Sequence, residues 1–192
     1  NVRPISALKA RVWIKQGEFE KAIGWAHERK LSIEEEPSYL REFEQITFAR
    51  ILLSQYRSDH SISLLHDAMG LLERLLKTAE EGGRIGSVIE ILTLQALAHQ
   101  MQEDIPAALP SLEGALKLAE PEGYMRIFLA EGASMAELIR EANTRGIMQD
   151  YTRKLLLAFE VEDQGLDVGT AHSATPVSTS LIEPLSQREL DI

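Results

Sequence analysis

The sequence contains no cysteine, and this absence excludes one kind of cross-link and one kind of metal site. Without thiols the chain forms neither disulfides nor zinc sites built on thiolates. A cysteine-free chain suits a reducing compartment, and we expect the protein to reside in the cytoplasm. No apolar run approaches the roughly 20 residues that a membrane helix needs, so we predict no membrane partner.

Positive charge is also scarce. The chain has 20 Lys and Arg against 30 Asp and Glu, which gives a formal net charge of −10 at pH 7. Because phosphate binding needs clustered Lys and Arg, we expect that these 192 residues do not hold nucleic acid by themselves. The 44% of hydrophobic and 26% of charged residues are ordinary for a folded domain.

Signatures of catalysis and of cofactor binding are missing as well. The sequence contains no G-x-x-x-x-G-K-[ST] loop for phosphates, and no two histidines stand four residues apart as a helical metal pair would. The acidic run Glu34–Glu36 next to Pro37 is typical of a solvated loop. We therefore predict that the chain is not an enzyme and that it has no catalytic residue, metal site or cofactor of its own.

Helical periodicity is present nearly throughout. In residues 39–56, for example, one helix face carries Phe43, Ile46, Ala49, Leu53 and Tyr56. Glycines separate such stripes, at Gly17 and in the segment "EEGGR", and glycine is typical of turns between helices. No segment shows sustained alternation with hairpin turns at its ends. The sequence therefore predicts an all-α fold.

Three patterns predict where helices begin. Ser87 with Glu90 and Ser134 with Glu137 have the spacing of a capping box, in which the serine and the glutamate satisfy backbone N–H groups of the first turn. Asp104 precedes another apolar stripe and can cap it alone. We therefore predict helix starts at these three places.

The helices occur in pairs, and the pairs resemble tetratricopeptide (TPR) repeats. The segments "QGEFEKAIGWAHERKL" and "QEDIPAALPSLEGALKLAEP" each resemble the second half of a TPR unit. In the first helices a small Ala10, Ala49 or Ala96 is followed three residues later by a larger side chain, as close helix pairing requires. The resemblance implies a TPR-like α-solenoid of antiparallel helix pairs, wound into a right-handed superhelix over residues 1–160, with degenerate repeats.

The composition changes after this region. Residues 161–180, "VEDQGLDVGTAHSATPVSTS", are rich in Gly, Ser and Thr and predict a linker. In residues 181–192 the pair Ser186 and Glu189 forms another capping box, for a helix that has barely begun at Ile192. Since the chain also starts at Asn1 rather than Met, we expect it to be a piece of a longer protein.

The last residues resemble the start of a known DNA-binding domain. "PLSQRELDI" resembles the opening of a LuxR-type helix-turn-helix domain, and Ser186, Arg188 and Glu189 occupy places of that pattern. The segments "YLREFEQITFARILL" and "EPEGYMRIFLAEGASMAELI" resemble stretches just upstream of that domain in MalT-like regulators. These are large ATP-dependent transcription activators with an NTPase module, a TPR superhelix and a C-terminal helix-turn-helix.

The resemblance implies a regulatory role for this region. It would be the effector-sensing and protein-interaction domain of a bacterial ATP-dependent LuxR-family transcription regulator. Its partners would be a small-molecule inducer or a regulatory protein, with self-association in the full-length protein and DNA bound only through the complete helix-turn-helix. ATP would belong to the NTPase module of the full-length protein. The alternative is a TPR scaffold for protein partners or self-association, without a small-molecule effector.

Three arginines occupy equivalent places in first helices, and these are Arg11, Arg50 and Arg126. In a TPR superhelix this place faces the concave groove, where the arginines could bind carboxylates or phosphates of an effector or partner bidentately. The other interpretation is that each arginine pairs with a glutamate of the next helix and ties the repeats together. The sequence leaves both roles open.

Overall fold

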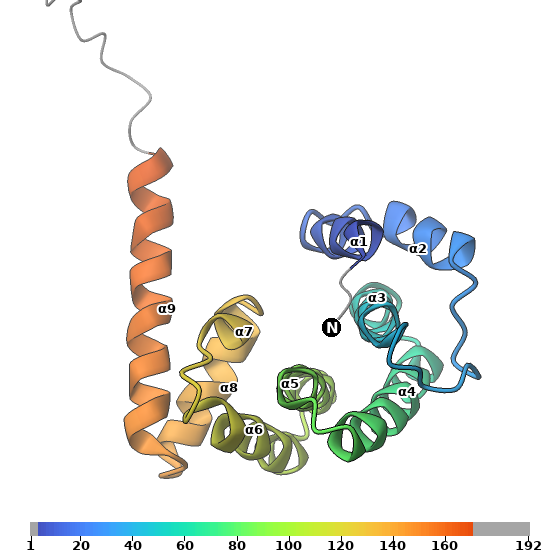
Figure 1. Ribbon diagram of the computed structural model, residues 1–192. Helices are drawn as coiled ribbons and strands as arrows, with labels where there is room; N and C mark the ends of the chain where they lie inside the picture. Colours follow the sequence, from blue (N-terminus) through green and yellow to red (C-terminus); the bar gives the residue numbers. More distant parts are fainter. Residues whose placement is uncertain (1–3, 171–192) are drawn as a thin grey trace, which may run out of the picture. The chain divides into compact units, whose positions relative to one another are not determined.

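The computed structural model describes residues 4–170, and helices are the only regular elements in them, which confirms the predicted all-α fold. The helices are α1 (Ile5–Lys15), α2 (Phe19–Glu28), α3 (Glu42–Asp59), α4 (Ile62–Glu81), α5 (Ile85–Met101), α6 (Ile105–Ala119), α7 (Arg126–Leu129), α8 (Ala133–Thr144) and α9 (Gln149–Thr170) (Figure 1). The chain divides into two compact units, Asn1–Phe159 and Glu160–Ile192.

The helices of the first unit pack in the order of the sequence, as in a TPR-like solenoid. Figure 1 shows α1, α3 and α5 on the inner side of the curve that these helices follow, with α2, α4 and α6 on the outer side. Each inner helix contacts the next inner helix as well as its own partner. This arrangement confirms the prediction of stacked helix pairs and places α1, α3 and α5 side by side along one surface.

Small residues allow the close approach of these helices. Ala10, Ala49 and Ala96, which the sequence pattern selects, are all fully buried. The buried apolar side chains form three clusters along the chain, one around α1 to α3, one around α3 to α5 and one from α5 to α9. Because α3 and α5 each contribute to two clusters, the core is continuous from one helix pair to the next.

One of the three predicted helix starts is confirmed and two are wrong. The backbone N–H of Ala107 donates to the carboxylate of Asp104 at 3.0 Å, so Asp104 caps α6. Helices α5 and α8 begin before Ser87 and Ser134, which therefore lie inside the helices and not at their caps. The Ser87 hydroxyl instead donates to the buried carboxylate of Glu42 on α3. A serine and a glutamate at capping-box spacing can thus serve contacts between helices.

Helix α9 extends further than the sequence predicts. It continues to Thr170, so residues 161–170, which were expected to start the linker, are helical. This stretch contains two glycines, each of which costs a helix only about 1 kcal/mol, and no proline interrupts it. The rest of the predicted linker, residues 171–180, lies outside the described residues, as does the predicted start of the DNA-binding domain in residues 181–192 with Ser186, Arg188 and Glu189.

Candidate functional site

A pocket of about 510 Å³ lies among the inner helices α1, α3 and α5 and the segment that follows α7. This volume is within the range of about 300–1,000 Å³ that is typical of small-molecule sites. Apolar side chains of the inner helices form much of its wall, among them Leu8, Val12, Ile14, Leu53, Leu94 and Leu97. Its polar lining residues are Arg11, Lys15, Arg50, Ser54, Arg57 and Glu131.

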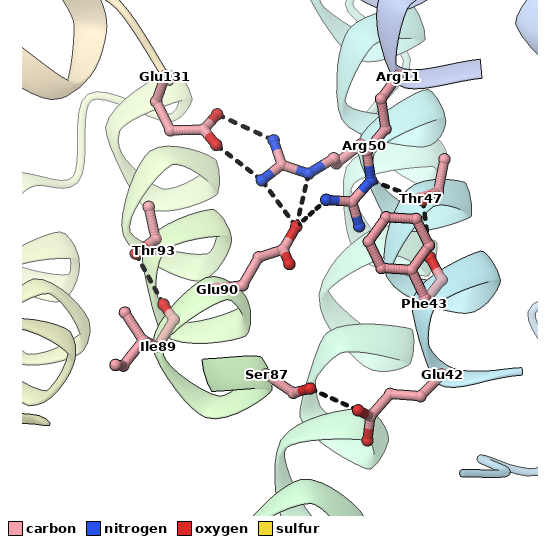
Figure 2. A network of polar contacts seen from close by, with 10 residues as sticks. All are labelled: Arg11, Glu42, Phe43, Thr47, Arg50, Ser87, Ile89, Glu90, Thr93 and Glu131. Carbon is pink, nitrogen blue, oxygen red and sulfur yellow. Dashed lines mark hydrogen bonds and ion pairs between the residues drawn. The ribbon is translucent and has the colours of Figure 1, made fainter. Parts of the chain in front are cut away.

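Arg50 is the centre of a charged network in the pocket wall (Figure 2). Its Nη1 and Nη2 donate to the two carboxylate oxygens of Glu131 at 3.0 and 2.7 Å, which is a bidentate pair. Its Nε and Nη2 also donate to Oε1 of Glu90 at 3.1 and 2.9 Å. Nη1 of Arg11 donates to the same oxygen at 2.6 Å. The network therefore links α1, α3, α5 and the segment after α7.

Arg11 makes further contacts with α3. Its Nε donates to the hydroxyl of Thr47 at 2.8 Å, and that hydroxyl donates to the Phe43 carbonyl at 2.7 Å. The guanidinium carbon also lies 3.8 Å from the centroid of the Phe43 ring, a cation–π contact that Figure 2 shows. The Nη2 atom of Arg11 is buried and has no hydrogen-bond partner among the described residues 4–170. A hydrogen bond to Thr47 and a cation–π contact with Phe43 thus fix Arg11 against the neighbouring inner helix.

Burial and pairing act against each other on the pKa values of the network. Burial lowers the pKa of Arg11 to about 10, although Glu90 partly offsets this. Burial also acts to lower the pKa of Arg50, but the carboxylates of Glu131 and Glu90 outweigh it and raise that pKa. Burial would raise the pKa of Glu90, whereas Arg50 and Arg11 hold it below its usual 4.5. These three groups are therefore charged at neutral pH.

The structure brings two of the three predicted arginines together. Arg11 and Arg50 both line the pocket, and both also pair with a glutamate of another helix or segment. Their side chains remain 19% and 17% exposed. Arg126 does not line this pocket and is exposed on α7. Helix α7 has only four residues, so it cannot extend along the groove as α1 and α3 do.

Glu90 and Glu131 are the network residues that sequence reasoning missed. The capping-box spacing assigns Glu90 to a helix start, and no sequence pattern singles out Glu131. Among the residues of α5, Glu90 is the single Asp, Glu, Lys or Arg. A lone carboxylate in such a helix signals a buried cationic partner, because an unpaired buried charge is strongly unfavourable.

The part of the chain that the structure describes offers neither a metal site nor a membrane span. It contains no group of three or more His, Cys, Asp or Glu side chains that could hold a metal ion. Likewise, none of the helices in residues 4–170 is both long and apolar enough to cross a membrane.

Stacked helix pairs whose first helices line a common pocket define a TPR-like α-solenoid. Comparison with protein families is more specific: the family described as the MalT-like TPR region matches residues 1–145. The chain belongs to this family. Searches of curated proteins and of solved structures find no match.

Proposed function

We propose that the chain is the effector-sensing domain of a cytoplasmic, bacterial, ATP-dependent LuxR-family transcription regulator, and that the effector binds in the pocket of the inner helices. One observation carries the proposal: the pocket of about 510 Å³ has in its wall a charged network that joins four elements of the solenoid. Membership of the MalT-like TPR region family supports a sensing and interaction role.

The network gives a physical route from binding to regulation. Arg50 holds Glu90 on α5 and Glu131 after α7, so a ligand that touches Arg50 or Glu131 acts on contacts between different helix pairs. An effector that binds one arrangement of these pairs more tightly increases the population of that arrangement. In the full regulator, the NTPase module with its ATP and the helix-turn-helix would respond to this change, and self-association would follow.

A thermal-shift screen of metabolites on the 192-residue chain tests the proposal. A ligand at 100 times its dissociation constant stabilises the folded state by about 2.7 kcal/mol and raises the unfolding midpoint. Ala130 is an exposed residue that lines the pocket, so Ala130→Trp should fill the pocket and abolish the shift. The control is Lys77→Trp, at an exposed site of α4 outside the pocket, and this variant should keep the ligand-induced shift. Equal shifts in the two variants would contradict a ligand in this pocket.

A second function, a scaffold for protein partners, is favoured by the apolar surface of α1. Ile5, Leu8 and Val12 are 83%, 42% and 50% exposed, and a partner protein could cover them. Sedimentation analysis of the chain and of Ile5→Asp distinguishes this function. Self-association that Ile5→Asp abolishes, together with an effector screen without hits, would favour the scaffold over the sensor.

A further inference from the structure

The pocket is lined by two cations outside the charged network, Lys15 and Arg57. No ion pair involves either of them within residues 4–170. In the same part of the chain, Arg57 makes one hydrogen bond, from Nη2 to the hydroxyl of Ser134 at 3.4 Å, which is long for such a contact. Both side chains belong to exposed residues and are therefore accessible to a ligand.

The positions of these cations give the pocket two different ends. Lys15 follows Arg11 by four residues on α1, and Arg57 follows Arg50 by seven residues on α3. At a rise of about 1.5 Å per residue, they lie about 6 and 10 Å further toward the C-terminal ends of these helices. Apolar side chains, including Ile14 on α1, lie between the two ends.

The charges of the two ends differ. The network contains two arginines and two glutamates, so its formal charges cancel. Lys15 and Arg57 remain as positive charge, in a chain whose net charge is −10. From this arrangement we infer that the pocket binds an amphipathic monoanion, an aliphatic or aryl carboxylic acid. Its carboxylate would lie at Lys15 and Arg57, and its apolar body would lie on the side chains between them and the network.

A simpler role for the two cations is to stabilise helix ends, since both lie in the last turn of their helix. Lys117 on α6 is an example of a cation with this simpler role. It pairs with Glu113 one turn earlier, at 2.7 Å, and does not line the pocket. One turn before Lys15 stands Arg11, and one turn before Arg57 stands an apolar residue. Neither cation has a carboxylate at that place, so both stay available to an anionic ligand.

Calorimetric titration with octanoate, decanoate and the uncharged octanamide tests the inference, which rests on the proposed effector site. We expect octanoate to bind at least about tenfold more tightly than octanamide, because a charge-assisted contact contributes on the order of that factor. Each added methylene that the pocket buries should strengthen binding about fourfold, so decanoate should bind more tightly than octanoate.

Three variants test whether Lys15 and Arg57 bind the carboxylate of the ligand. Lys15→Gln and Arg57→Gln should each reduce octanoate affinity severalfold and leave octanamide affinity unchanged. Lys77→Gln removes an exposed positive charge outside the pocket and should change neither affinity. Equal affinity for octanoate and octanamide, equal effects of all three variants, or no binding of either carboxylate would overturn the inference. The proposed function is judged separately, by the metabolite screen and by whether Ala130→Trp abolishes the effector-induced shift.

Discussion

Arg50 donates hydrogen bonds to two carboxylates that lie 40 and 81 residues away in the sequence. Its position in the pocket wall makes it both a tie between helix pairs and a group that a ligand can reach. Desolvation offsets much of the Coulomb attraction in such a network, so the intact network contributes little net stability compared with apolar packing. Removal of one partner is different, because the remaining charges stay buried without compensation.

Replacement of Arg50 therefore gives the first prediction at the residue scale. Arg50→Ala should lower the free energy of unfolding by about 3–5 kcal/mol, since Glu90 and Glu131 lose their main partner. The control is Arg145→Ala, which removes a 2.7 Å pair with Glu141 whose side chains are 48% and 40% exposed. That variant should change stability by less than about 0.5 kcal/mol. Urea unfolding of both variants measures the difference, and similar small losses would show that the network does not hold the fold.

The lowered pKa of Glu90 gives a prediction about pH. A carboxylate whose pKa is lower in the folded state stabilises the fold above its unfolded pKa, and this stability is lost as the pH falls through the folded pKa. The wild-type chain should therefore lose stability below about pH 4.5, the usual pKa of this group. Glu90→Gln has no such titration, so its unfolding midpoint should be lower near pH 7 and should fall less between pH 5 and pH 3. Parallel pH profiles of the two proteins would contradict the assignment to Glu90.

At the scale of helices and turns, glycines at two positions have opposite roles. Gly17 lies between α1 and α2 with φ of +75°, in the left-handed region where side chains are unfavourable. Gly24 lies within α2, where glycine costs more conformational entropy than alanine. An added Cβ would meet nothing within 4 Å at either position, so backbone conformation alone decides the effect.

The same substitution should consequently have opposite signs at the two sites. Gly17→Ala should reduce the free energy of unfolding by about 1–2 kcal/mol, because alanine is forced into the left-handed region. Gly24→Ala should increase it by about 0.5–1 kcal/mol. Chemical denaturation of both variants checks the signs. Destabilisation by Gly24→Ala would show that the exposed face of α2 needs this glycine for another reason.

Sequence patterns predict the elements of this chain better than their ends. The apolar period of residues 39–56 predicts a helix and a face whose residues Phe43, Ile46 and Ala49 are buried. Thr47 and Ile51 of α3 are buried as well, because neighbouring helices cover further sides of α3. Ser87 could not be placed from its neighbours, because its partner Glu42 lies on another helix. The end of α9 differs from the prediction too, since the two glycines and the threonine in residues 161–170 lower helix propensity without excluding a helix.

At the scale of the whole molecule, the candidate site depends on how the repeats stack. The equivalence of Arg11 and Arg50 could be predicted, because each follows a small residue at the same place of an inner helix. Their partners Glu90 and Glu131 could not, because only the stacking of successive pairs brings them to the arginines. Arg126 does not occupy an equivalent place, because α7 is too short to be an inner helix like α1 and α3.

Net charge gives a prediction for the 192-residue chain as a whole. With a net charge of −10, it should not bind duplex DNA tightly even at low salt, because no excess of cations is available for phosphates. A longer chain that includes a complete helix-turn-helix should bind DNA, since the recognition helix supplies the base and phosphate contacts. Fluorescence anisotropy with a labelled duplex at several salt concentrations measures both. Tight, salt-sensitive binding by residues 1–192 would contradict the proposal that DNA is bound only through the complete helix-turn-helix.

The three apolar clusters predict that the solenoid does not open uniformly. The cluster around α1, α2 and part of α3 contains the fewest buried side chains, and α1 is further held by the contacts of Arg11 with Thr47 and Glu90. In repeat proteins each unit is stabilised by its own core and by its neighbours, so the end with the smallest core opens first.

Arg11→Ala should therefore loosen α1 and α2 while it leaves α6 and α8 unaffected. The loss of its buried hydrogen bonds should accelerate amide exchange in α1 and α2 by about tenfold or more, because each such bond to a charged group contributes about 1.5–3 kcal/mol. Ser6→Ala, at an exposed site of the same helix, should leave exchange unchanged. Hydrogen–deuterium exchange followed by mass spectrometry resolves the helices separately. If α6 and α8 accelerated as much as α1, the solenoid would open as one cooperative body, and Arg11 would stabilise all of its helix pairs together.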